Sequence, residues 1–229
     1  MEFLTGVVCV LIYYVVLAAI ALALRFLISI PDELFRKLLH AILLGSLPVF
    51  LFSFCKWWHA VLFCIIFATA VYPILMLFEK HKDYSRTVTE RKKGELKSSL
   101  LVVFAMFAIV ITVCWGAFAD KWLAMASVYA WGVGDAAAAL IGKKFGKHKI
   151  AGMKKSYEGS FAMLFCAFVS SLIFLICRGG MEWYAYAITS LAVGAAATAT
   201  ELYTPGGLDT ITCPLSAMTV MLPLVYLVF

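Results

Sequence analysis

The chain has 229 residues, of which 64% are hydrophobic and 14% charged, with a formal net charge of +6 and a mean hydropathy of +0.98. A soluble domain of this length needs many more polar residues to cover its surface, so the composition excludes a soluble globular protein and indicates an integral membrane protein. The seven cysteines are scattered without a C-x-x-C pair, which argues against a disulfide framework or a metal site.

Apolar runs long enough to cross a hydrocarbon core, which takes about 20 helical residues, recur along the chain. The first run lacks a basic leader and a small-residue cleavage pattern, so we interpret it as a retained span and not a signal peptide. The sequence predicts an all-α, polytopic membrane bundle of about eight transmembrane helices, which forms a single integral membrane domain over residues 1–229. In chain order the expected spans are 3–24, 38–54, 58–78, 98–117, 121–141, 159–177, 183–200 and 212–229.

The distribution of basic residues predicts the orientation of these spans. With eight spans, 16 of the 19 lysines and arginines fall in loops on one side of the bilayer, and only Lys56, Lys121 and Arg178 fall on the other. Cytoplasmic loops of membrane proteins are enriched in Lys and Arg, so we expect the basic loops to face the cytoplasm and both termini to lie on the opposite side. The segments expected to form a cytoplasmic active site are 25–38, 79–97, 142–158 and 201–212.

The first two cytoplasmic segments carry clusters of cations. Arg36, Lys37 and His40 share one helix face at three- and four-residue spacing, either as a snorkelling anchor for the span or as part of a site. The second segment has three consecutive basic residues, which suit nucleotide phosphates or anionic lipid headgroups. These three residues are Arg91, Lys92 and Lys93.

The third cytoplasmic segment suits an anion. Its glycines let backbone N–H groups approach a phosphate, and its lysines supply positive charge. It is not a Walker motif, because three residues separate Gly142 from Gly146 and His148 stands where Ser or Thr is required. Ser156 is placed to cap the next helix, whose free N–H groups favour negative ligands; an ordinary capped helix behind a basic loop is the alternative. The expected phosphate-binding residues are Gly142, Lys143, Gly146, Lys147, Lys149, Lys155, Ser156 and Gly159.

Acidic residues accompany this basic segment. Asp135 lies inside the span 121–141, where an ionisable group is costly unless it faces the protein interior and has a partner. Small residues recur every four positions beside Asp135 and also before Glu201, and such faces let membrane helices pack closely. If these two spans pack together, Asp135 and Glu201 approach each other, and Mg²⁺ completed by phosphate oxygens would offset their repulsion. Asp209 is a third acid at the same interface.

Several of these motifs together resemble the dolichol kinase and phytol kinase family, which includes the CTP-dependent diacylglycerol kinase of yeast type. The resemblance runs from about residue 31 to 215, and its most specific part is the Gly-Asp, Gly-Lys and Lys-Ser-x-Glu-Gly series. In the family the late acidic motif usually reads Asp-Asn, whereas here Thr210 follows Asp209. The resembling segments are 36–40, 91–95, 134–135 with Gly142, 146–147, 155–160, Glu201, Asp209 and 214–215.

The resemblance implies a polytopic membrane enzyme that transfers the terminal phosphate of a nucleotide, typically CTP, to a polyprenol, a phytol-like isoprenoid or diacylglycerol. Such chemistry needs charge neutralisation on the phosphates more than covalent catalysis. The partners are then a nucleoside triphosphate from the cytosol and a lipid alcohol from the bilayer; nucleic acid is not expected, and the sequence leaves the oligomeric state open. The expected catalytic residues are Asp135, Glu201 and His40; the expected Mg²⁺ ligands are Asp135, Glu158, Glu201 and Asp209; and the expected nucleotide-binding residues are the cations and glycines named above.

Two other functions fit part of the pattern. A CDP-lipid synthase also uses CTP and Mg²⁺ at a membrane face, but the Lys-Asp, His-Gly-Gly and Asp-Arg series associated with such enzymes is missing from this sequence. A transporter would explain Asp135 as an ion site within the membrane. Against a transporter, the polar residues gather at one face and nothing comparable lines the other half of a pathway.

Overall fold

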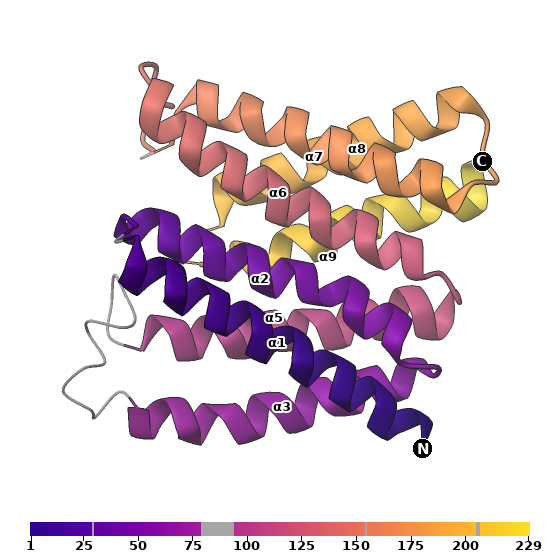
Figure 1. Ribbon diagram of the computed structural model, residues 1–229. Helices are drawn as coiled ribbons and strands as arrows, with labels where there is room; N and C mark the ends of the chain where they lie inside the picture. Colours follow the sequence, from indigo (N-terminus) through magenta and orange to yellow (C-terminus); the bar gives the residue numbers. More distant parts are fainter. Residues whose placement is uncertain (29, 79–93, 154, 205–206) are drawn as a thin grey trace. The chain divides into compact units, whose positions relative to one another are not determined.

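The computed structural model describes residues 1–28, 30–78, 94–153, 155–204 and 207–229, and this part of the chain contains helices but no strand (Figure 1). The prediction of an all-α protein is therefore confirmed. The helices are α1 (Glu2–Leu27), α2 (Asp32–Ser53), α3 (Trp57–Phe78), α5 (Glu95–Val110) continued by the π-helical η1 (Ile111–Ala117), α6 (Lys121–Phe145), α7 (Tyr157–Arg178), α8 (Trp183–Tyr203), and α9 (Asp209–Pro223) continued by the π-helical η2 (Leu224–Val228).

Each expected span corresponds to one helix, with ends shifted by a few residues. Among the described residues, seven helices are long and apolar enough to cross a membrane. The helix outside this set is α8, which has the length, at 21 residues, but contains several Ala, Thr and Tyr residues that lower its hydropathy. The helices indicate an integral membrane protein, and the sidedness of the termini stays a prediction.

The chain divides into two compact units, Met1–Thr112 and Val113–Phe229. In the first unit, α1 packs on α2 and α3 packs on α5. Its interior is aromatic: the ring of Phe50 lies 5.6 Å from that of Phe63 and 6.0 Å from those of Phe104 and Phe107, and all four side chains are buried. Offset and edge-on contacts of this kind stabilise a helical core beyond the area they bury.

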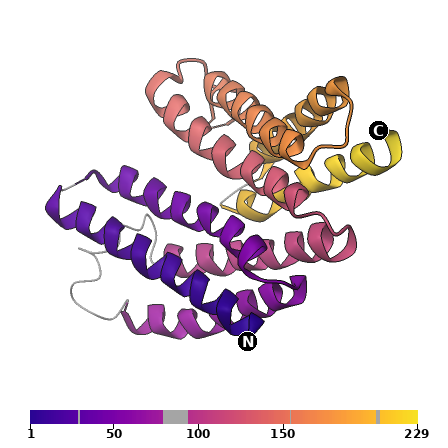
Figure 2. The ribbon, with the colours of Figure 1, turned by 45° about the vertical axis from the view of Figure 1, so that its right-hand side comes forward.

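In the second unit, α7 lies between α6 and α8 (Figure 2). Glycines make both contacts close: a Cβ atom built on Gly159 would lie 3.1 Å from the carbonyl oxygen of Ala138, and one built on Gly194 would lie 3.1 Å from that of Leu164. Small residues permit this approach of membrane helices. The small faces of α6 and α8 thus pack mainly on α7, with fewer contacts between α6 and α8 themselves.

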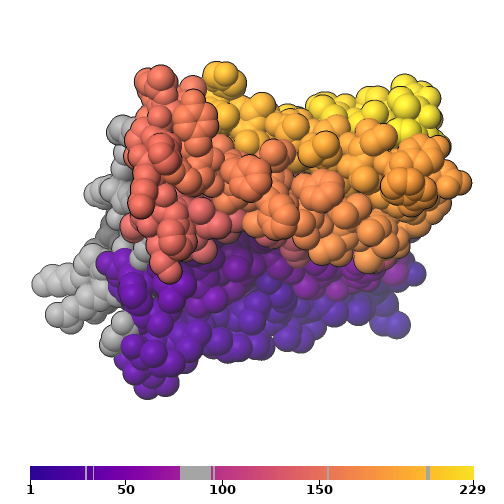
Figure 3. All heavy atoms as spheres, turned by 90° about the horizontal axis from the view of Figure 1, so that it is seen from above, coloured from indigo at the N-terminus to yellow at the C-terminus, as the bar shows by residue number. Residues whose placement is uncertain are grey.

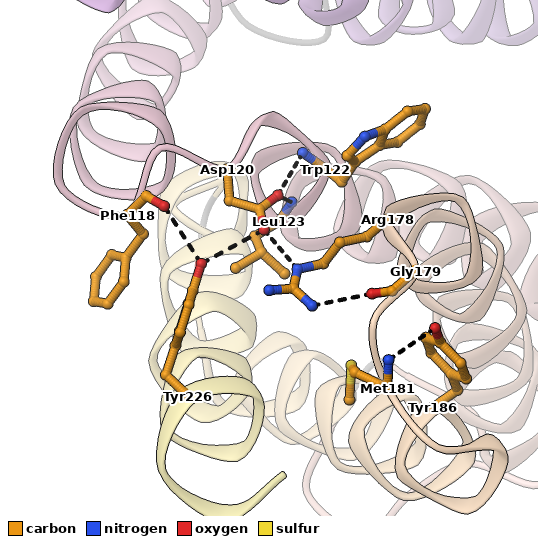
Figure 4. Close-up of polar contacts among 9 residues, drawn as sticks. All are labelled: Phe118, Asp120, Trp122, Leu123, Arg178, Gly179, Met181, Tyr186 and Tyr226. Carbon is orange, nitrogen blue, oxygen red and sulfur yellow. Dashed lines mark hydrogen bonds and ion pairs between the residues drawn. The ribbon is translucent and has the colours of Figure 1, made fainter.

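The second unit has two polar ends. At one end, α6 and α8 finish and α7 and α9 begin, and we call this the loop end because residues 146–153 and 155–156 lie there. At the opposite end, Arg178 Nε donates to Asp120 Oδ2 at 2.5 Å, while Asp120 Oδ1 accepts from the N–H groups of Trp122 and Leu123 and so caps α6 (Figure 4). The hydroxyl of Tyr226 lies 3.5 Å from the same carboxylate. This clamp joins α6, α7 and the C-terminal helical segment.

Candidate functional site

Three acids from three helices lie within electrostatic range of the same groups at the loop end. Asp209, in the first turn of α9, interacts electrostatically with Asp135 of α6 and with Lys155, and the indole of Trp131 lies beside it. The thiol of Cys213, one turn along α9 and buried, interacts with Asp209, Glu201 and Asp135 alike. We call Asp135, Glu201, Asp209 and Lys155 the acidic cluster. It combines residues that are 74 positions apart in the sequence.

The helix ends bring these residues to the same level. Glu201 lies in the last turn of α8, and Asp209 opens α9 after a short connection. The two helices are joined there by a hydrogen bond of 3.1 Å between the hydroxyls of Thr204 and Thr212. Asp135 lies ten residues before the end of α6, about 15 Å along the axis, so α6 extends beyond the cluster.

Lys155 supplies the cation of the cluster. Its Nζ lies 2.7 Å from Glu201 Oε1, and it also donates to the backbone carbonyl of Glu201 at the end of α8. The Glu201 side chain is 13% exposed and that of Lys155 is 32% exposed. Because both groups are largely withdrawn from solvent, the ion pair fixes the loop before α7 against the end of α8.

The donor set of the cluster suits a hard divalent cation. Asp135, Glu201 and Asp209 present carboxylate oxygens and are half-buried. Within the described residues no three Asp, Glu, His or Cys side chains are grouped closely enough to hold a metal by themselves. Mg²⁺ commonly takes one or two carboxylates and completes its shell with water and substrate phosphates, so the cluster fits Mg²⁺ arriving with a nucleotide.

Glu158 is not joined to the cluster by the contacts it makes. Its Oε1 accepts from the N–H groups of Lys147 and His148, at 3.3 and 3.1 Å, and lies 2.6 Å from Nδ1 of His148. Two backbone N–H groups of the loop that our sequence analysis expected to bind phosphate therefore bind this carboxylate. The N–H of Gly146 is also engaged, by the carbonyl of Gly142. In this arrangement Glu158 holds the loop, and its assignment as a metal ligand stays a prediction.

The loop itself is folded tightly onto the start of α7. Lys149 and Ser156 form an antiparallel bridge, and the N–H of Tyr157 donates to the carbonyl of His148 at 3.0 Å. Ser156 caps α7, since its hydroxyl accepts from the N–H of Gly159 at 3.2 Å. The expected cap is thus present. Gly142 and Lys143 lie in the last turn of α6, which continues to Phe145, and not in a loop as expected.

The remaining expected site residues are distributed as follows. Lys143, Lys147 and Lys149 are exposed at the loop end, and Gly142 and Gly159 face each other where α6 crosses α7. In the first unit, the helix α2 carries three expected residues that are all partly exposed: Arg36, Lys37 and His40. The remaining three, Arg91, Lys92 and Lys93, lie outside the described residues.

Sequence reasoning missed two residues of this region. His148 was noted only as a departure from the Walker pattern, yet its Nδ1 lies 2.6 Å from Glu158 Oε1. A histidine and a glutamate at opposite ends of one short loop could have indicated this contact. Cys213 was counted only as one of seven scattered cysteines, although its thiol lies within electrostatic range of the three acids. Its spacing of one turn from Asp209 places both on the same face of α9.

Comparison with known proteins finds a partial similarity to one lipid kinase. The chain is 32% identical over 92 residues to the phytol kinase of Synechocystis sp.. The alignment covers 39% of this chain and 38% of that enzyme, so it spans well under half of either protein. No family model matches the chain, and no solved structure matches it significantly. The findings support a distant relationship to a lipid kinase, in a membrane protein whose helices are apolar enough to span the bilayer.

Proposed function

We propose that this protein is a membrane-embedded lipid-alcohol kinase that transfers the terminal phosphate of CTP to the hydroxyl of an isoprenoid alcohol or diacylglycerol. The acidic cluster is the observation that carries the proposal. Asp135, Glu201 and Asp209 come from three helices and lie within electrostatic range of the same groups near Lys155, at the end of the unit that also carries exposed lysines. The distant similarity to a phytol kinase supports the same class of reaction.

The charges of the cluster fit phosphoryl transfer. A nucleoside triphosphate brings several negative charges, which need cations close to the phosphates and a hard metal ion between them. Asp135, Glu201 and Asp209 would hold Mg²⁺, which would supply charge neutralisation on the transferred phosphate. Lys155, whose Nζ lies beside Glu201, would contact a phosphate oxygen, and the exposed Lys143 and Lys149 would attract the nucleotide from the aqueous side.

The carboxylates would also act on the acceptor. In the transfer, the lipid oxygen forms a bond to the terminal phosphorus, the bond from that phosphorus to the bridging oxygen breaks, and CDP leaves. The hydroxyl proton passes to a carboxylate of the cluster, for which we propose Asp135 or Glu201. Asp135 lies inside a membrane-spanning helix, so a hydroxyl carried by a bilayer lipid would reach it without leaving the membrane.

The nucleotide and the orientation follow from the same proposal. The preference for CTP comes from the resemblance of the motifs to CTP-dependent lipid kinases. The cytosol is the source of nucleotide, so the loop end would face the cytoplasm, as the enrichment of Lys and Arg there also indicates. Arg36, Lys37 and His40 would then lie on the cytoplasmic side of the first unit.

The test uses purified protein in detergent with Mg²⁺, γ-labelled CTP or ATP, and a panel of phytol, a polyprenol and diacylglycerol. We expect label in a lipid phosphate for the native chain, and a loss of about 100-fold or more in kcat for Asp135→Asn, as is typical when a group that contacts the reacting atoms is removed. Glu182→Gln is the matched control, because Glu182 is exposed at the opposite end and caps nothing through its side chain.

Two outcomes would contradict the proposal. Incorporation of α-labelled CTP into lipid with release of pyrophosphate would identify a CDP-lipid synthase instead. Intact nucleotide with every lipid, together with ion flux into proteoliposomes that Asp135→Asn abolishes, would identify a transporter.

A further inference from the structure

A groove runs along the second unit on the side formed by α6 and α7. Its volume is about 770 Å³, and its walls are almost wholly apolar. Most of its length is lined by large side chains that are more than half exposed, among them Phe145, Phe161 and Phe165. In Figure 3 the salmon and orange spheres of the loop and of α7 form part of the visible face of this unit. Exposed phenylalanines in a row, on helices able to span a membrane, indicate a surface that meets hydrocarbon.

The length of the groove matches one leaflet. Along α7 it extends from Tyr157 to Cys166, and the nine helical steps between these residues span about 13.5 Å. A hydrocarbon core is about 30 Å thick, so one leaflet contributes roughly half of that. The groove begins where α7 begins, at the loop end, and therefore runs inward over the depth of the nearer leaflet. A fatty-acyl chain of that leaflet fits this course.

The end of the groove is polar and basic. His148 and Glu158 close it, and the carboxylate of Glu158 is already bound to His148 and to two backbone N–H groups. Lys144 stands at the rim, with its Nζ 5.1 Å from the centre of the Phe145 ring, and the exposed Lys147 adjoins His148. Because the Glu158 carboxylate, which lines the groove, is held by the loop, Lys144 and Lys147 leave this part of the surface basic.

We propose that this groove binds an anionic phospholipid, with one acyl chain along α7 and the headgroup phosphate held by Lys144, Lys147 and His148. Basic recesses between membrane helices bind anionic headgroups in this way. The site is distinct from the acidic cluster, since none of the four cluster residues lines the groove. The bound lipid would hold the loop 146–156 against the start of α7, whether or not the cluster transfers phosphate.

The experiment reconstitutes the full chain in phosphatidylcholine nanodiscs that contain a photoreactive phosphatidylglycerol with a diazirine in one acyl chain. After irradiation, peptides are mapped by mass spectrometry. We expect label within 141–145 and 157–166, displaced by unlabelled phosphatidylglycerol far better than by phosphatidylcholine. Each of Lys144→Ala and Lys147→Ala should lower the preference for the anionic lipid about five-fold, the typical contribution of one lysine near a membrane surface.

Two matched controls separate the site from general lipid contact. Lys121→Ala removes a lysine at the other end of α6, where it lies over Trp115, and should leave the preference unchanged. Phe165→Ala should reduce labelling of the groove, whereas Ile173→Ala, at an equally exposed position farther along α7, should not.

Three results would overturn the inference. Equal displacement by both phospholipids would show an ordinary hydrocarbon surface without headgroup recognition. Labelling spread evenly along α7, up to Ile173, would show the same. A groove protected from every lipid, in a particle whose mass is that of two chains, would show that a second copy covers it. None of these results depends on kinase activity, which is measured separately.

Discussion

The ion pair of Asp120 and Arg178 at the start of α6 makes a prediction that can be worked out from distances. Arg178 Nε lies 2.5 Å from Asp120 Oδ2, and the two side chains are only 18% and 11% exposed. Removing one partner of a buried pair leaves the other charge uncompensated, which costs about 3–5 kcal/mol. Asp120→Ala also removes the cap that accepts from Trp122 and Leu123, for about 1 kcal/mol more.

The loss of unfolding free energy in the double variant should therefore be smaller than the sum of the losses in the two single variants. Arg178→Met leaves Asp120 with its two backbone N–H donors and with Tyr226, so we expect a loss near the lower limit, about 3 kcal/mol. In Asp120→Ala/Arg178→Met no charge is left unpaired, and the loss should fall short of the sum of the single losses by about 2 kcal/mol.

The assay is the free energy of unfolding in mixed micelles, with denaturing detergent as the variable, followed by circular dichroism of the helices. Glu182→Gln is the control at the same end, since its exposed carboxylate caps nothing, and it should change stability by less than about 0.5 kcal/mol. If the single losses simply add in the double variant, Asp120 and Arg178 do not interact and the reasoning from their distance is wrong.

Three further predictions follow from the loop end and the helix contacts. Lys155→Met should raise the KM for nucleotide at least ten-fold and weaken the attachment of the loop to α8. Lys149→Met should have a smaller effect on KM. Equal effects of the two substitutions would contradict a special role for Lys155. Gly159→Ala should destabilise the chain by about 1–3 kcal/mol, because the new Cβ would lie 3.1 Å from a backbone carbonyl, while Ser160→Ala should cost less. Reporter fusions should place both termini on the non-cytoplasmic side, and a cytoplasmic C-terminus would refute the orientation drawn from the basic loops.

The sequence by itself determined the helices and their class. Apolar runs of about 20 residues leave the backbone only one way to satisfy its hydrogen bonds in lipid, so the spans could be predicted from composition alone. The helix ends were predicted less accurately: α6 continues past Gly142 to Phe145, because one glycine costs only about 1 kcal/mol within a helix and the lysines after it favour helix. The sequence analysis did not predict that α5 and α9 continue as π-helices.

The tertiary structure decided which helices touch. In the sequence, the small residues around Asp135 have the same four-residue spacing as those before Glu201. Such a face indicates that a helix packs closely there, but it does not identify which helix. In the structure that helix is α7, which presents Gly159 and Met163 to α6 and the backbone of Leu164 to Gly194. The acids still approach one another, because α9 returns to the loop end and places Asp209 near Asp135.

The structure also decided what each charged group binds. The position of Glu158 in the sequence indicated that it lies near the loop. A carboxylate can either bind a metal ion or accept hydrogen bonds from the loop, and the sequence does not show which groups lie near it. In the structure the N–H groups of Lys147 and His148 donate to it. Likewise, Lys155 was one of several equivalent lysines until its distance of 2.7 Å to Glu201 separated it from the exposed ones. Patterns along a chain identify residue types and helix faces, whereas the partners of a buried charge depend on contacts between segments far apart in the sequence.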